Sequence, residues 1–364
     1  MNKISLCTVC MNRLSYLCET LPANIQQNSR FPFVEFVVLN YNSRDGMDDW
    51  MKNNMQEHIE SGILKYYVTT EPAYFDLSHS KNLALKLASG DIIGMLDADN
   101  YAGVDYVNWV NDAFEENGKN TVVTTLRRDF IPYRDQGGKL CFHRDLLHAV
   151  NGFDESMKGY GVEDVDLVNR LEKIGGRRVY ISNEVHLKFI SHSNEERLKN
   201  FYLSNNLERL FLRISGTMKT ESGVLYLLKD GRFYRTGYQY DEMLRHNLVL
   251  TYGGWTLKEG MNHSGSYRET GEGVLLEYEN GGQSLYREEG PGMLSSSGMD
   301  GEYLWEQVRE NDELFEDLLM GYGECLNRSR YRTNDRSTGV VNSGGWGRGV
   351  VYKNFDYMNP VRVD

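Results

Sequence analysis

One stretch of the chain decides the fold, SGDIIGMLDADN at residues 89–100. Its apolar part, 91–96, predicts a short buried strand, and Gly90 ends a helix expected over 78–88 with Ser78 as its N-cap. Asp97 and Asp99 follow the carboxyl end of that strand. In open α/β sheets this is the edge at which ligands bind. The stretch therefore predicts an α/β fold with a functional site beside the two aspartates.

The residues around this stretch alternate between strand and helix patterns. Such alternation predicts a mainly parallel, Rossmann-like sheet with flanking helices. A polar turn cluster at 40–46 follows one of the expected strands. The expected strands are 4–10, 33–39, 64–69, 122–126 and 139–143, and the expected helices are 14–25, 164–173 and 193–214.

The composition changes beyond Gly216, where glycine and tyrosine become frequent. Short apolar runs at 223–228, 248–252 and 274–278 are separated by glycine-containing turns, which predicts antiparallel hairpins. We expect a single helix over about 303–320 in this part and a loosely ordered tail. A chain of 364 residues favours two domains. The predicted division is an α/β domain over 1–215 and a β-rich accessory domain over 216–364.

Charge and cysteine content exclude several classes of protein. The net charge of -12 argues against a nucleic-acid partner, because binding to a phosphate backbone needs a basic face. Five scattered cysteines do not form a disulfide framework, and the pair Cys7 and Cys10 lies in an expected buried strand without a second metal-ligand pair. Neither a membrane-spanning apolar run nor a signal-peptide pattern is found, so the sequence predicts a cytoplasmic protein.

Three groups of residues could carry chemistry. Asp97 and Asp99 suit Mg²⁺ or Mn²⁺, although a polar loop after a strand has the same composition. Glu163 and Asp164 lie at an expected helix start, where carboxylates are also common as capping groups. The glycines and Tyr160 just before them favour a ligand-facing loop. His192 lies between an expected strand and a helix, from which it could reach the two aspartates.

Taken in order along the chain, these segments resemble the inverting GT-A glycosyltransferases of family 2, and most closely the β-1,4-galactosyltransferase-like branch. The resemblance covers roughly residues 3–215. The segments that carry it are 8–13, 40–46, 80–82, 89–99, 151–155, 161–164, 169–171 and 190–193.

The resemblance implies a metal-dependent transfer of a sugar from a nucleotide-sugar donor, expected to be a UDP-sugar, to a hydroxyl of a glycan or glycoconjugate. Asp99 and His192 would bind Mn²⁺ or Mg²⁺, with Asp97 at the metal or the donor ribose. Asp164 would be the general base, and Glu163 would orient it or hold the acceptor. The other implied donor-binding residues are Thr8, Arg13, Asn40, Asp45, Lys81 and Asn82, and the other implied acceptor-binding residues are Tyr160 and Gly161.

Two alternatives remain at this point. A sugar-nucleotide pyrophosphorylase would need a glycine-rich, basic loop after the first strand, and residues 10–13 do not supply one. A non-catalytic carbohydrate-binding or scaffold protein would use the C-terminal part, which could equally bind an acceptor glycan, a partner or a second copy of the chain. Its aromatic residues could stack on sugars, but core packing and cross-strand pairing are the more common use: Tyr226, Tyr234, Tyr238, Tyr252, Trp255 and Tyr286.

Overall fold

The computed structural model describes residues 2–126, 137–214, 221–239, 256–257, 262–298, 301–311 and 314–364. The chain divides into two compact units. The first comprises Met1–His192 together with Arg330–Asp364, and the second comprises Ser193–Ser329. The expected boundary lies at 215, whereas the observed units divide between His192 and Ser193. The last 35 residues also belong to the first unit.

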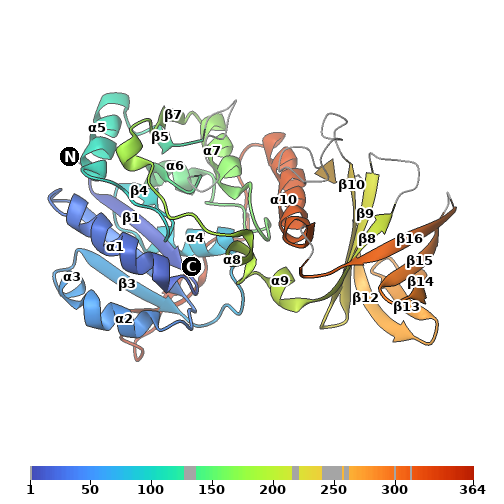
Figure 1. Cartoon of the computed structure of the whole chain (residues 1–364). Helices are drawn as coiled ribbons and strands as arrows, with labels where there is room; N and C mark the ends of the chain where they lie inside the picture. Colours follow the sequence, from blue (N-terminus) through green and yellow to red (C-terminus); the bar gives the residue numbers. More distant parts are fainter. Residues whose placement is uncertain are drawn as a thin grey trace. The chain divides into compact units, whose positions relative to one another are not determined.

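A mixed sheet forms the centre of the first unit (Figure 1). Its strand order is β18-β17-β3-β2-β1-β4-β6-β5-β7. The central pairs β3–β2, β2–β1 and β1–β4 are parallel, and β6 and β17 run antiparallel to their neighbours. The strands are β1 (Ile4–Cys10), β2 (Val34–Tyr41), β3 (Leu64–Thr69), β4 (Ile92–Met95), β5 (Thr121–Thr124), β6 (Leu140–His143), β7 (Arg177–Tyr180), β17 (Gly349–Lys353) and β18 (Val361–Val363).

Helices cover both faces of this sheet, as the alternating pattern predicts. One face packs against α1, α2, α3 and α5, and the other against α4, α6 and α7. The helices are α1 (Leu14–Asn28), α2 (Met47–Asn54), α3 (Gln56–Glu60), α4 (Leu77–Leu87), α5 (Tyr106–Asn117), α6 (Arg144–Ala149) and α7 (Glu163–Lys173), with a 3-10 turn η2 (Glu184–His186).

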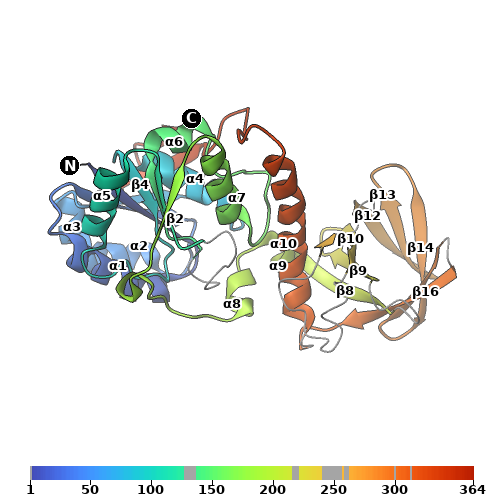
Figure 2. The same ribbon diagram turned by 90° about the horizontal axis from the view of Figure 1, so that it is seen from above.

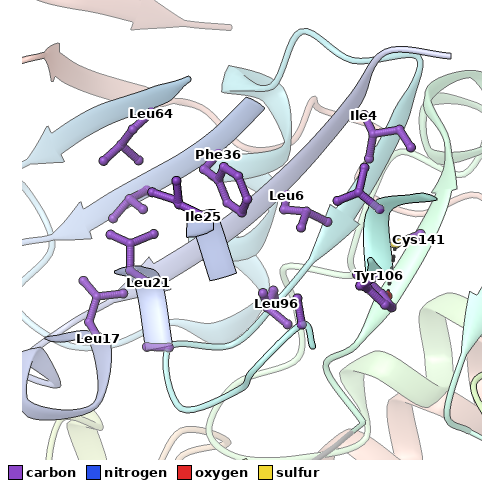
Figure 3. Close-up of a cluster of buried hydrophobic side chains, with 14 of the residues drawn as sticks. Ile4, Leu6, Leu17, Leu21, Ile25, Phe36, Leu64, Leu96, Tyr106 and Cys141 are labelled. Carbon is purple, nitrogen blue, oxygen red and sulfur yellow. Dashed lines mark hydrogen bonds between the residues drawn. The ribbon is translucent and has the colours of Figure 1, made fainter. Parts of the chain in front are cut away.

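Two apolar clusters, one on each face, hold the sheet between its helices. Every residue of β1 is buried, which is typical of a strand covered on both faces. Figure 3 shows part of one cluster, in which Ile25 of α1 lies beside Phe36 of β2 and Tyr106 bonds to Cys141. Burial of such side chains is worth about 1.5–3 kcal/mol each. The core therefore fixes the sheet edge that carries the candidate site.

Helix α4 begins slightly earlier than the sequence predicts. Its N-cap is Asp76, whose side chain accepts a hydrogen bond from the backbone N–H of His79, whereas Ser78 lies inside the first turn and is buried. Aspartate and serine are comparable N-caps, so the sequence alone did not separate them.

The C-terminal segment belongs to the first unit and forms two strands there, where the sequence predicted a loosely ordered tail. Strand β17 pairs antiparallel with β3, and β18 pairs with β17. Trp346 and Val351 are buried in the same cluster as Leu83 of α4. Apolar residues spaced through a polar segment are enough to anchor it once a sheet edge is available.

The second unit is an antiparallel β-barrel (Figure 2). Its strands follow the order β10-β12-β13-β14-β15-β16-β8-β9, and the β9–β10 pairing closes the ring. Closure removes unpaired edges. The strands are β8 (Leu207–Ile214), β9 (Glu221–Leu228), β10 (Arg232–Gln239), β11 (Thr256–Leu257), β12 (His263–Thr270), β13 (Gly273–Tyr278), β14 (Gln283–Gly290), β15 (Met293–Gly298) and β16 (Gly301–Val308). The helices after His192 are α8 (Asn194–Leu198), α9 (Tyr202–Asn206) and α10 (Leu314–Asp335).

The antiparallel architecture confirms the predicted fold class, but two helix predictions in this part are wrong. Residues 301–308 are strand β16, in which Tyr303 and Trp305 alternate with exposed Glu302 and Leu304, so the pattern has the period of a strand. The helix follows only at α10. The expected helix over 193–214 consists of the short α8 and α9 followed by β8.

The aromatic residues singled out in this part serve mainly as packing groups where the structure describes them. Tyr226 and Tyr234 pack on Tyr322 of α10, and Tyr286 packs on Trp305. The side chain of Tyr238, the predicted run 248–252 with Tyr252, and Trp255 lie outside the described residues.

Candidate active site

The expected site residues gather at the carboxyl edge of the parallel strands. Strands β1 and β2 end side by side, with Cys10 opposite Asn40. Asp97 and Asp99 follow β4, which is the neighbour of β1 on its other side. Arg13 lies at the start of α1, directly after β1. One sheet edge thus collects charged side chains that are far apart in the sequence.

Polar contacts fasten the loops at this edge to one another. The Thr8 hydroxyl donates to the Leu96 carbonyl at 2.8 Å, and Asp45 accepts from the backbone N–H of Leu14 at 2.8 Å. Arg13 lies over the ring of Tyr16, 5.5 Å from its centroid. These contacts hold the loops at the sheet edge together. Arg13 places a positive charge close enough to Asp97 to lower its pKa.

Asn40 is buried, and its side-chain contacts all lie inside the protein. Its amide nitrogen donates to Asp48 and to the Tyr66 hydroxyl, both at 2.9 Å, and its Oδ1 accepts from the backbone N–H of Ser43 at 2.7 Å. This arrangement orients the loop after β2. Asn40 thus lies in the expected nucleoside-binding loop and supports it, and its implied role in donor binding stays a prediction.

His192 is brought against Asp99 by backbone pairing. The segment before it lies beside the residues after β4, with an antiparallel bridge between Asn100 and Phe189 and a 2.8 Å hydrogen bond from Ile190 N–H to the Asp99 carbonyl. As a result His192 Nε2 lies 2.6 Å from Asp99 Oδ2, and both side chains are largely buried. The sequence expectation that His192 reaches across to the aspartates is met at Asp99.

Asp97 lies deeper and packs against a glycine. A Cβ atom at Gly138 would come within 3.0 Å of the Asp97 carboxylate, which leaves room only for glycine. Burial raises the pKa of Asp97, Lys81 opposes this effect, and Asp99 and Glu163 add to it. Among the described residues, no group of three or more His, Cys, Asp or Glu side chains is gathered closely enough to hold a metal ion. Of the two aspartates, Asp99 is the one that the structure pairs directly with His192.

Lys81 joins the two expected catalytic carboxylates. Its Nζ lies 2.7 Å from Asp164 Oδ1 and 2.9 Å from Glu163 Oε1. The Lys81 side chain is only 4% exposed, so these contacts are shielded from water. The structure pairs Lys81 with the acids at the start of α7, and its implied role in donor binding stays a prediction.

Burial and neighbouring charges shift the pKa values of this trio. Burial raises the pKa of Asp164 to about 7, Lys81 opposes that rise, and Glu163 and Asp97 increase it. Burial by itself lowers the pKa of Lys81, but Asp164, Glu163 and Asp97 outweigh it and raise that pKa well above its ordinary value. A carboxyl group with a pKa near 7 is suited to accept a proton at neutral pH.

The backbone before these acids is strained. Gly159 and Gly161 adopt left-handed conformations, with φ of 78° and 90°, and Val162 has a φ of 76°. A β-branched residue in this region is a genuine outlier, and it costs of order 1–3 kcal/mol. Tyr160 and Gly161 are half-buried in the same turn. Strain of this kind collects at functional loops, in agreement with the predicted acceptor side of the site.

Asn82 supports the acceptor side from α4. Its side chain donates to the Phe153 carbonyl at 2.9 Å and to Glu155 at 2.8 Å, and it accepts from the Phe153 N–H at 2.7 Å. It is completely buried. Asn82 therefore holds the turn over 151–155 in place, and its implied role in donor binding stays a prediction.

Sequence reasoning missed Lys139 and the glycines before it. Lys139 is fully buried, and its Nζ donates to the carbonyls of His186 at 2.6 Å and Lys188 at 3.1 Å. Burial lowers its pKa to about 8, while Asp97 and Asp99 act in the opposite direction. Gly137 faces Asp164 Oδ2, and Gly138 faces Asp97. The sequence feature that could have revealed them is the run Gly137-Gly138-Lys139 directly before an apolar strand.

With this geometry established, comparison with known sequences identifies the first unit. Residues 5–160 match the family Glycosyl transferase family 2, and residues 128–195 match the N-terminal domain of galactosyltransferase. Both matches include Tyr160, and the second extends across Glu163, Asp164 and His192. These two matches confirm the resemblance inferred from the sequence.

Individual relatives match this chain over limited lengths. Chondroitin sulfate synthase 3 of Homo sapiens and of Mus musculus are each 41% identical over 61 residues. That stretch is 16% of this chain and 7% of each synthase, so the chain matches only a small part of their length.

Solved structures resemble about half of the chain. A mannosyltransferase from Pyrobaculum calidifontis, in complex with GDP-Man and Mn²⁺, has a TM-score of 0.41 at 21% identity, covering 50% of this chain and 55% of its own. TarS 1-349 of S. aureus has a TM-score of 0.41 at 16% identity, covering 54% and 61%.

Two further expectations concern the whole chain. In the part of the chain that the structure describes, no helix is both long and apolar enough to cross a membrane. All five cysteines are free thiols, and burial raises the pKa of Cys7 well above its ordinary value and that of Cys10 to about 12. A raised pKa makes a thiol unreactive, in agreement with a packing role for both residues.

Proposed function

We propose that this glycosyltransferase is a metal-dependent, inverting enzyme that moves a sugar from a nucleotide-sugar donor, expected to carry UDP, to a hydroxyl of a glycan or glycoconjugate. The observation that carries this proposal is the buried trio Lys81, Glu163 and Asp164, set beside Asp97 at the sheet edge. The two acids lie at the start of α7, directly after the strained Val162. The raised pKa of Asp164 suits a group that accepts a proton from the acceptor hydroxyl.

Asp164 serves as the general base. Its carboxylate takes the proton of the acceptor hydroxyl as that oxygen forms a bond to the anomeric carbon of the donor sugar. The bond from that carbon to the diphosphate oxygen breaks at the same time, and the nucleoside diphosphate leaves. Lys81 favours the ionised form of the Asp164 carboxylate and fixes its orientation. Glu163 holds the acceptor or the base in place. A positioned base typically contributes about 10²–10⁴-fold to the rate.

Asp99 and His192 fit a divalent ion as a pair. Carboxylate oxygen and imidazole nitrogen are both ligands for Mn²⁺, and Oδ2 and Nε2 already face each other. In the described part of the chain, His192 Nδ1 is buried without a hydrogen-bond partner, so only Nε2 has a polar contact. Mn²⁺ or Mg²⁺ bound here would neutralise charge on the departing diphosphate. Donor phosphates and water would complete the coordination, with Asp97 at the donor ribose.

Arg13, at the start of α1, supplies a cation for the diphosphate, and Lys81 pairs with the acids at the start of α7. Thr8, Asn40 and Asp45 shape the loops that line the nucleoside, and Asn82 supports the turn on the acceptor side. Tyr160 and Gly161 form the half-buried rim through which the acceptor enters.

The first experiment is a calorimetric titration of the full chain with UDP, with Mn²⁺ and then with EDTA. Metal-dependent binding supports the donor half of the proposal, and UDP-sugars are then screened for transfer. Binding of UDP that persists unchanged in EDTA contradicts metal dependence. Binding of another nucleotide in place of UDP contradicts the uridine donor alone.

The base assignment has its own test. Asp164→Asn is expected to bind donor and metal normally and to lose about 10²–10⁴-fold in transfer rate. An unchanged rate rules out Asp164 as the base. A matched control is Asp145→Asn, which changes a carboxylate that is 69% exposed on α6.

A further inference from the structure

The inner face of the barrel carries both apolar and charged side chains. Strand pairing shows which side chains share this face, because residues directly opposite each other point to the same side. Phe211, Leu225, Leu227, Phe233 and Leu276 belong to an apolar cluster that also includes Tyr286 and Trp305. The same face carries two arginines: Arg213 lies opposite Trp305, and Arg235 lies opposite Leu225.

Six residues form a connected group on this inner face, which we call the Trp305 cluster. The indole of Trp305 is fully buried and donates from Nε1 to the Ser296 hydroxyl at 2.9 Å. Its ring lies 5.4 Å from that of Tyr286, and Gly223 leaves the space that the indole occupies. The members are Arg213, Arg235, Tyr278, Tyr286, Tyr303 and Trp305.

Both arginines of the cluster lie on aromatic rings. The Arg235 guanidinium is 5.6 Å from the centroid of the Trp305 ring, and that of Arg213 is 4.8 Å from the Tyr303 ring. Arg235 makes one polar contact, 3.5 Å to the Tyr278 hydroxyl, and no carboxylate of the described residues pairs with it. A half-buried guanidinium without a counter-charge is unfavourable. The barrel thus holds a positive group that suits an anion.

The members of the cluster differ in solvent exposure. Trp305 and Tyr286 are buried, whereas Arg213, Arg235, Tyr278 and Tyr303 are partly exposed. The ring of His263 lies 5.4 Å from that of Tyr278 and is also partly exposed. Ligand sites commonly combine aromatic side chains with a few polar groups. In this cluster the partly exposed tyrosines supply aromatic faces, and the two arginines supply the polar groups.

We propose that the Trp305 cluster binds an acidic saccharide, a sugar ring that bears a carboxylate or a phosphate. Arg235 and Arg213 hold the anionic group, since a guanidinium donates two parallel hydrogen bonds to such oxygens. Tyr278 and Tyr303 supply aromatic faces for the sugar ring. This second site lies wholly within Ser193–Ser329 and does not depend on the proposed transfer reaction.

The test is calorimetric titration of the full chain, without donor or metal, with trigalacturonate, glucose 6-phosphate and the neutral maltotriose. We expect at least one acidic probe to bind and maltotriose to bind at least tenfold more weakly. Preference for trigalacturonate identifies the anion as a carboxylate, and preference for glucose 6-phosphate identifies it as a phosphate. Equal binding of neutral and acidic probes, or no binding of either acidic probe, overturns the proposal.

Variants locate the binding. Arg235→Gln is expected to weaken the binding of the acidic probe at least tenfold. Arg235→Lys keeps the charge but loses the two parallel hydrogen bonds of the guanidinium, so it should weaken binding less. Arg287→Gln is the matched control on the barrel, because that side chain is 67% exposed and on the outer face. Asp164→Asn should leave acidic-probe binding unchanged, which separates this site from the transfer site. If Arg235→Gln fails to fold, Arg213→Gln replaces it, and unchanged affinity in the folded variant refutes the proposal.

Discussion

Replacing Lys81 by methionine tests how the base is kept ionised. The substitution retains the length of the side chain and removes the cation that lies 2.7 Å from Asp164 and 2.9 Å from Glu163. An opposite charge at this range lowers a carboxyl pKa by about 1–3 units. The pKa of Asp164 is about 7 with Lys81 present, so Lys81→Met should raise it to roughly 8–10.

The kinetic consequence follows from the ionised fraction. A base must be deprotonated to act, so kcat/KM rises with pH through the pKa of the base. At pH 7 the ionised fraction falls from about one half to between roughly one tenth and one thousandth, which predicts a loss of roughly 5-fold to 500-fold. The loss should shrink as the pH is raised. We expect the acid limb of the pH profile to move to higher pH by the same 1–3 units.

The assay is release of nucleoside diphosphate as a function of pH, with the donor identified by titration. Lys119→Met serves as control, because that side chain is 71% exposed. Loss of a buried ion-pair partner costs about 3–5 kcal/mol, so thermal unfolding is measured in parallel. If Lys81→Met does not fold, the double variant Lys81→Met with Glu163→Gln removes one uncompensated charge. A folded variant whose acid limb stays near pH 7 refutes the reasoning.

Three further outcomes follow from the contacts. Gly138→Ala should weaken donor binding at least tenfold by displacing Asp97, whereas Gly118→Ala, at a position with open space, should change only stability; equal donor affinity in Gly138→Ala would contradict the packing argument. His192→Ala should weaken Mn²⁺ binding by calorimetry at least tenfold relative to His148→Ala, a change at an exposed residue of α6, and identical titrations would remove His192 from the ion site. Burial raises the pKa of Glu35, but hydrogen bonds from Lys65, Ser5 and Ser89 outweigh this effect and lower that pKa to about 2. Glu35→Gln should therefore lower the free energy of unfolding in urea by about 2 kcal/mol above pH 4.5. The difference should shrink progressively as the pH falls toward 2.

The sequence predicts the first unit well because its signals are local. The strand before Asp97 is a run of apolar residues, and the turn after β2 is marked by Asn and Gly, so position along the chain is enough to place both at one sheet edge. The order of strands and the approach of His192 to Asp99 depend on pairing between distant segments. The position of His192 between an expected strand and a helix made its approach to the aspartates possible, and the family resemblance favoured it.

The roles of individual polar residues were harder to predict than their positions. Asn40 and Asn82 lie in the segments expected at the donor, but their amides are used to hold loops. Lys81 and Asp164 are 83 residues apart, and nothing in the sequence indicates that they form an ion pair. A side chain with several donors can serve a ligand or the fold, and only the contacts distinguish the two. Lys139 was missed for the same reason, since its partners are backbone carbonyls.

The return of the C-terminal segment to the first unit changes how the catalytic part can be isolated. Asp154, at the turn that Asn82 supports, is buried and accepts from Arg330 at 2.8 Å and from Asn334 at 2.7 Å. Asn334 also bonds to Asp166, which pairs with Arg170 inside α7. A chain ending near residue 215 would lose these partners, the strands β17 and β18, and the buried Trp346. It would leave a buried carboxylate unpaired at the acceptor side, a change that costs several kcal/mol. The helix that carries Asp164 is therefore stabilised by residues from the end of the chain, and the first unit needs both of its segments to fold.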